Sequence, residues 1–174
     1  MKKTIVINLF GAPGAGKSQT MAGIFSQLKA HGIDCEQAPE FVKEMVWADR
    51  MDETRDQTYI FAKQNHRLFR LNGRVDIIIT DAPLLQSLYY GKDDAEFVRF
   101  VKHTASGYTN FNYFLNRIKA YNPNGRYQTE EESDALGKKL RSILIENEVH
   151  FEELDGGQTA IDIIVDKILS GENI

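Results

Sequence analysis

The sequence of 174 residues contains little cysteine and proline and has no repeats or flexible linkers. Its single cysteine, Cys35, cannot form an internal disulfide or a zinc cluster built on several thiolates. A reducing compartment, the cytoplasm, is therefore expected. Only four prolines occur, and no repeat, low-complexity tract or Ser/Gly linker divides the sequence. Residues 1–174 are accordingly expected to form one domain.

Long hydrophobic runs and an excess of positive charge are also missing. No stretch approaches the roughly 18 apolar residues that cross a bilayer, and the apolar segment near the start is short and interrupted by Asn8. Lysine and arginine number 21 against 25 aspartates and glutamates, a net charge of −4. Any binding site for an anion must therefore be local.

Segments with the pattern of buried strands alternate with amphipathic segments along the chain. Strands are expected at residues 4–10, 33–38, 75–80, 108–115 and 149–154. Helices are expected at residues 17–32, 40–49, 54–72, 83–90, 93–103, 129–144 and 158–169. This alternation predicts an α/β fold: a mainly parallel sheet of about five strands with helices on both faces. Ligands of such sheets bind beyond the carboxyl ends of the strands.

Two capping boxes predict where helices begin. Thr54 with Gln57, and Thr129 with Glu132, have the spacing in which each side chain bonds the backbone of the other residue. Gly73 is expected just after the first of these helices, where glycine tolerates a left-handed backbone.

The segment after the first strand, GAPGAGKS, satisfies the phosphate-binding pattern G-x-x-x-x-G-K-[ST]. Small residues let successive backbone N–H groups converge on phosphate oxygens, and the following helix adds positive potential at its start. Lys17 is expected to neutralise the β- and γ-phosphates, and the Ser18 hydroxyl to bind Mg²⁺. The residues expected to bind the donor nucleotide are Gly11, Ala12, Pro13, Gly14, Ala15, Gly16, Lys17, Ser18 and Gln19.

The rest of the sequence favours phosphoryl transfer over GTP or ATP hydrolysis. The base-reading N-K-x-D segment of GTPases is absent, and Ala82 follows Asp81 where a hydrolytic motor usually carries a water-activating glutamate. Asp81 ends the strand at 75–80, so it is expected to hold Mg²⁺ or face the acceptor hydroxyl; a helix cap is the alternative. Glu40, after the second strand, is the other candidate base, with a role in the helix dipole as its alternative.

Residues 116–128 (NRIKAYNPNGRYQ) are polar, rich in turn residues and basic, which is typical of a lid that excludes water. Arg117 and Arg126 are the expected catalytic arginines, because a guanidinium contacts phosphate through two donors. The alternative is an exposed basic loop.

The helix at 54–72 gathers Lys63, His66, Arg67 and Arg70 on one side, with Arg74 following. This face is either simply solvated or a patch for a phosphate of a polynucleotide such as DNA. Four aromatic residues are candidates to stack on an acceptor base, although side chains at such spacing more often belong to the core: Trp47, Tyr59, Tyr89 and Tyr90.

The strand–GAPGAGKS–helix unit resembles the P-loop kinase superfamily. Residues 38–47 (APEFVKEMVW) resemble the E-P-V-x-x-W-like segment of deoxynucleoside kinases, which implies that Glu40 is the base and that Trp47 lies near the pocket. Residues 117–136 are similar to the lid and following helix of small NadR-type nicotinamide riboside kinases and their phage relatives. The resemblance also implies the sheet order 2-3-1-4-5, an ATP donor and a phage or bacterial source.

Some members of this family phosphorylate free nucleosides, and one phage branch phosphorylates 5-hydroxymethyluracil within DNA. The sequence departs from the family where Pro39 precedes Glu40 and where the strand end reads TDAP. We expect a kinase that uses ATP and Mg²⁺ on a nucleoside-like hydroxyl, with 5-hydroxymethyluracil in DNA favoured by the basic helix face. A free nucleoside, a nucleotide or nicotinamide riboside is the alternative acceptor. Rival hypotheses for the whole protein are a non-catalytic ATP sensor and a slow ATPase.

Overall fold

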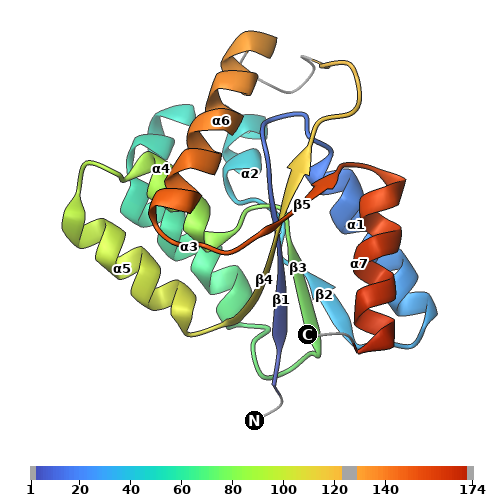
Figure 1. The fold of residues 1–174 in the computed structure, drawn as a ribbon. Helices are drawn as coiled ribbons and strands as arrows, with labels where there is room; N and C mark the ends of the chain where they lie inside the picture. The colour runs from blue at the N-terminus through green and yellow to red at the C-terminus, as the bar shows by residue number, and fades with distance from the viewer. Residues whose placement is uncertain (1–2, 123–128, 172–174) are drawn as a thin grey trace.

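The computed structural model describes residues 3–122 and 129–171, and its centre is one parallel sheet (Figure 1). Its five strands have the order β2-β3-β1-β4-β5. They are β1 (Ile5–Phe10), β2 (Cys35–Gln37), β3 (Ile77–Thr80), β4 (Thr109–Asn116) and β5 (Glu152–Asp155). All four strand pairings are parallel. The predicted fold class and the strand order implied by the resemblance are both confirmed.

Helices cover both faces of the sheet, with α1 and α7 on one face and the other helices opposite (Figure 1). The α-helices are α1 (Lys17–Ala30), α2 (Val42–Trp47), α3 (Gln57–Phe69), α4 (Ser87–Tyr90), α5 (Ala95–Ser106), α6 (Glu130–Glu146) and α7 (Gln158–Ser170). Two short 3₁₀ segments are η1 (Met51–Arg55) and η2 (Leu84–Gln86). None of the helices within 3–122 and 129–171 is both long and apolar enough to cross a bilayer.

Alternate residues of β1 serve the two sides of the core, as the pleat requires. Ile7 and Leu9 pack with side chains of α1 and α7, whereas Val6 packs with side chains of α3 and α5. Phe10 is fully buried against α6. This double burial explains why β1 is apolar at nearly every position.

The structure corrects the predicted start and end of the helix at 54–72. The cap of α3 is Asp56, whose carboxylate accepts a hydrogen bond from the Tyr59 amide at 2.9 Å. Thr54 and Gln57 form no capping box, because Thr54 lies in η1 and donates to the Met51 carbonyl. The helix ends at Phe69, before the predicted Asn72.

The second capping box and the remaining helices follow the predicted pattern more closely. Thr129 accepts from the Glu132 amide while the Glu132 carboxylate accepts from the Thr129 amide, so the box that opens α6 is confirmed. The single helix predicted at 83–90 is instead η2 followed by α4.

Candidate active site

Gly11–Ser18, the segment with the phosphate-binding pattern (the phosphate loop), forms the tight connection between β1 and α1 that its composition predicts. Gly11, Gly14 and Gly16 have φ angles of 144°, 82° and 88°, a region that residues with a Cβ rarely adopt. At Gly11 a Cβ would also lie 2.7 Å from the Leu115 carbonyl oxygen of β4. The loop therefore needs glycine both for its path and for its contact with the sheet.

Lys17, the first residue of α1, folds back over this loop. Its ammonium group donates to the carbonyl oxygens of Gly11 at 2.8 Å and Ala12 at 3.1 Å. A cation is thereby held within the arch of the loop, where a phosphate chain would need one.

Helix α6 supports the same loop from the other side. The buried Ser133 hydroxyl donates to the Pro13 carbonyl at 2.7 Å. At Gly137 a Cβ would lie 2.8 Å from the Cβ of Ala12, so α6 touches the loop without an intervening side chain. Neither contact was foreseen, although a serine and a glycine on the inner side of an amphipathic helix indicate close approach.

Asp81, directly after β3, forms hydrogen bonds both to the phosphate loop and to the segment that follows β2. It is 4% exposed, and its Oδ2 accepts a hydrogen bond from the Ser18 hydroxyl at 2.6 Å. Its Oδ1 accepts from the backbone amide of Glu40 at 3.0 Å. Ser18, Asp81 and Glu40, which lie far apart in the sequence, are thus brought together at the carboxyl edge of the sheet.

Burial and neighbouring charges of both signs act on the pKa of the Glu40 carboxyl. Burial raises its pKa above the ordinary range, and the charge of Asp81 raises it further, while the ammonium groups of Lys17 and Lys43 oppose the shift. Desolvation of the Tyr90 hydroxyl, together with the charge of Glu40, raises the pKa of that phenol to about 12. The Glu40 carboxyl thus interacts electrostatically both with Lys17 and with the half-exposed Tyr90 of α4.

The loop that carries Glu40 is held by residues that sequence reasoning missed. Gln64 of α3 is buried, and its Oε1 accepts from the Phe41 amide at 3.0 Å. The Thr80 hydroxyl of β3 donates to the Ala38 carbonyl at 2.7 Å. The sequence did hold one indication of this role: Gln64 lies four residues from both Ile60 and Leu68, which places it on the apolar face of the helix.

Arg67 also holds the loop that carries Glu40, so it does not form part of the exposed basic face that was predicted. Its side chain is 16% exposed, donates to the Pro39 carbonyl at 3.0 Å and pairs with Glu44 at 2.6 Å. Lys63, Arg70 and Arg74 are exposed, as the solvated face requires.

The predicted lid begins one residue later than expected, because Asn116 is the last residue of β4. Arg117 is 13% exposed and its Nη2 donates to Glu130 at 3.0 Å and to Asp134 at 2.7 Å. Its guanidinium stacks on the Tyr121 ring, 5.3 Å from the ring centre. Residues 123–128, with the predicted Arg126, lie outside the described residues.

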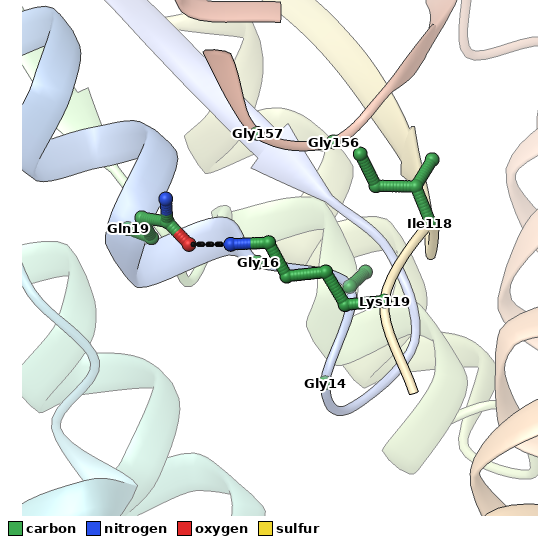
Figure 2. Close-up of a pocket in the computed structure, with 8 residues that line it drawn as sticks. Gly14, Gly16, Gln19, Ile118, Lys119, Gly156 and Gly157 are labelled. Carbon is green, nitrogen blue, oxygen red and sulfur yellow. Dashed lines mark hydrogen bonds between the residues drawn. The ribbon is translucent and has the colours of Figure 1, made fainter. Parts of the chain in front are cut away.

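A pocket lies between the phosphate loop and the loop after β5 (Figure 2). Lys119 spans it and donates to the Gln19 side chain at 3.0 Å. Its lining residues are Gly14, Ala15, Gly16, Gln19, Ile118, Lys119, Gly156 and Gly157. The paired glycines after β5 were not predicted as site residues, although their place at the carboxyl edge of the sheet was visible in the sequence.

No family model matches the sequence, and no curated protein matches it. Among solved structures, NadR in complex with NR is 17% identical and superposes with a TM-score of 0.68 over 98% of this chain and 52% of that chain. NadR in complex with NAD and AMP-PNP is 16% identical, with a TM-score of 0.73 over 98% and 51%. Deoxyadenosine kinase from M. mycoides with bound dCTP is 21% identical, with a TM-score of 0.60 over 95% and 99%.

The chain spans about half the length of the NadR chains that it matches. At these low identities the likeness concerns the fold. The expected similarity to NadR-type and deoxynucleoside kinases is confirmed at that level, and this chain has the α/β fold of the P-loop kinases.

Proposed function

We propose that this protein is a kinase that transfers the γ-phosphoryl group of ATP to a hydroxyl of a nucleoside-like acceptor. The observation that carries this proposal is the hydrogen-bonded connection from Ser18 through Asp81 to Glu40 beside the Lys17 ammonium group. It brings a phosphate-binding loop and a carboxyl group that can accept a proton to one edge of the sheet. The nucleotide and nucleoside ligands of the structural neighbours support the same interpretation.

The donor would lie with its phosphates in the arch of Gly11–Ser18 and its base beside the pocket of Figure 2, which now holds only about 20 Å³ and would have to widen. Lys17 would exchange its bonds to the Gly11 and Ala12 carbonyls for phosphate oxygens. The base would displace the contact between Lys119 and Gln19 that now spans the pocket.

The residues fit a bound Mg²⁺. Ser18 and Asp81 present oxygen atoms 2.6 Å apart, and Mg²⁺ in proteins is bound by one or two such groups together with phosphate oxygens and water. Within 3–122 and 129–171 no cluster of three His, Cys, Asp or Glu side chains forms a metal cage. Bound at Ser18 and Asp81, the ion would neutralise charge on the phosphates.

Glu40 is the better candidate for the base. Both oxygens of Asp81 already accept hydrogen bonds, from Ser18 and from the Glu40 amide, whereas the Glu40 carboxyl is buried close enough to Lys17 and Tyr90 to interact electrostatically with both. In the transfer, a bond forms between the acceptor oxygen and the γ-phosphorus, and the bond from that phosphorus to the β–γ bridging oxygen breaks. ADP leaves, and the acceptor's proton passes to Glu40.

A free nucleoside or nicotinamide riboside is the acceptor class that the neighbours support. A hydroxymethylated base in DNA is the second candidate, because Lys63, Arg70 and Arg74 are exposed on one helix and the segment after it. Because Arg67 is largely buried and paired with Glu44, it does not contribute its charge to that surface.

Transfer of labelled γ-phosphate from ATP tests the proposal. The acceptors are nucleosides, nucleoside monophosphates, nicotinamide riboside, and oligonucleotides with or without hydroxymethyluracil. We expect label on a free nucleoside-type acceptor and, for Lys17→Ala, at least about 100-fold slower transfer with the melting temperature retained. Release of inorganic phosphate regardless of acceptor would indicate an ATPase instead. ATP binding with no transfer to any acceptor would indicate a sensor.

A further inference from the structure

Among the residues that the structure describes, the guanidinium of Arg117 forms its hydrogen bonds through Nη2. Its Nη2 bonds both Glu130 and Asp134 of α6, whereas its Nη1 is buried and has no hydrogen-bond partner within the described residues. A buried donor on a charged group that lacks an acceptor costs free energy, on the order of 1–3 kcal/mol or more. The arrangement is therefore complete only when an acceptor reaches Nη1.

The position of this side chain indicates what the acceptor is. At Gly14, in the middle of the phosphate-binding loop, a Cβ would lie 3.8 Å from the Cδ of Arg117 and 3.2 Å from the Tyr121 ring. Tyr121 also stacks on the guanidinium and limits its rotation. Arg117 and Tyr121 thus lie beside the middle of the loop, and the phosphates of a nucleotide bound there would bring anionic oxygen acceptors of the required kind close to the guanidinium.

We infer that Asp134, with Glu130, is a positioning residue that orients Arg117 so that Nη1 donates to the phosphoryl group in transfer. This inference rests on the proposed function and adds to it two carboxylates on α6 that do not touch the substrate.

Helix α6 is a suitable platform for this orientation. The same helix bonds the loop through Ser133 and contacts it at Gly137. Because Asp134 directly follows Ser133, the carboxylate that orients Arg117 is fixed relative to the loop that holds the phosphates. The capping box at Thr129 and Glu132 fixes the start of the helix beside Glu130.

A double-mutant cycle between Asp134 and Arg117 tests the inference. Asp134→Asn keeps the shape of an exposed side chain but removes its charge. We expect kcat to fall about tenfold, as misoriented catalytic groups produce, with KM for ATP raised by no more than about threefold. Asp134→Glu restores part of kcat. In an Arg117→Ala background, Asp134→Asn has no further effect.

Glu153→Gln is the matched control, since it removes a different ion pair of α6, between Arg141 and Glu153. It should leave kcat at the wild-type value. The inference is overturned if Asp134→Asn slows the Arg117→Ala variant by the same factor as the wild type. It is also overturned if Asp134→Asn raises kcat, because the carboxylates would then withhold Arg117 from the phosphates.

Wild-type transfer is measured first, because a chain that labels no acceptor contradicts the proposed function whatever the variants do. In that case the cycle is measured on ATP affinity by calorimetry. Arg117→Ala and Asp134→Asn should each weaken ATP binding about twofold to threefold, and the double variant no more than Arg117→Ala alone. Additive losses, or no loss in either variant, would overturn the inference.

Discussion

At the scale of single residues, Glu40 combines a proposed catalytic role with a cost in stability. Its pKa is raised in the folded protein, chiefly by burial, so folding favours its protonated form. Above the ordinary glutamate pKa, here 4.5, the charged side chain therefore lowers the free energy of unfolding. This penalty grows as the pH rises through the interval between the unfolded and folded pKa values, and it is complete above both.

Glu40→Gln should separate the two effects. We expect kcat to fall about 100-fold, the usual contribution of a general base, while the melting temperature at pH 7 rises because the buried charge at position 40 is gone. The gain in melting temperature should disappear below pH 4.5, where both side chains are neutral. The measurement is thermal unfolding from pH 4 to 8 in EDTA without nucleotide. A variant less stable than wild type at pH 7 would contradict the argument.

The positions of Lys17, Ser18 and Asp81 could be predicted because their placement depends on local chemistry. The loop motif sets the first two, and the end of an apolar strand sets the third. Gln64 could not be predicted as a support of the Glu40 loop, since its partner, the Phe41 amide, lies 23 residues away. Arg67 looked like a surface cation for the same reason: its acceptors at Pro39 and Glu44 come from another element.

At the scale of elements, the start of α3 shows a competition between two local patterns. Asp56 accepts from the third amide of the helix, as a cap does. Thr54 instead bonds within η1. A carboxylate one residue before the helix also interacts more favourably with the helix dipole than a hydroxyl does. The predicted capping box had the right spacing but began two residues too early.

The two residues should therefore differ in their effect on stability. Asp56→Ala is expected to lower the free energy of unfolding by about 1 kcal/mol, the usual value of a helix cap. Thr54→Ala should cost clearly less, because it removes one bond inside a short 3₁₀ segment. Urea denaturation measures both. A larger loss for Thr54→Ala would restore the capping box that the sequence predicted.

The close approach of α6 to the phosphate loop leads to a second prediction at this scale. Gly137→Ala adds a methyl group 2.8 Å from the Cβ of Ala12, which must displace the helix or the loop. Displacing a well-packed element costs about 1–3 kcal/mol, and the loop is the less regular partner. We expect ATP affinity to fall about tenfold, measured by calorimetry.

The matched control is Ala135→Gly at an exposed position of the same helix. It should lower stability by about 1 kcal/mol through helix propensity and leave ATP affinity unchanged. If both variants weaken ATP binding equally, general loosening of α6 explains the effect and the contact with Ala12 does not.

At the scale of the whole molecule, the strand order determines how the chain holds together. The alternation of strands and helices predicted a parallel sheet, but the order of the strands came only from the resemblance, because periodicity carries no information on pairing. In the structure, β1 pairs with β3 and with β4, so Ile5 meets Ile77 on one side and Thr109 on the other. Segments more than 70 residues apart therefore complete one core.

This topology leaves no continuous part of the chain with a complete set of strand partners. Removing the first strand would leave β3 and β4 without their shared neighbour. We therefore propose that the protein is a single domain and unfolds in one cooperative transition. Far-UV circular dichroism and hydrogen exchange of the β1, β3 and β4 amides should report the same free energy of unfolding.

Nucleotide binding should shift that transition as a whole. At a concentration of Mg²⁺ and ATP about 100-fold above the dissociation constant, the folded state gains about 2.7 kcal/mol. For a domain of this size the melting temperature should rise by about 5–10 °C, and Lys17→Ala should abolish most of the rise.

Because β5 lies at one edge of the sheet and pairs only with β4, this edge is the part most able to unfold separately. Two transitions, of which ATP moves only the one containing β1, would show that the edge forms a separate unit and would contradict the single domain.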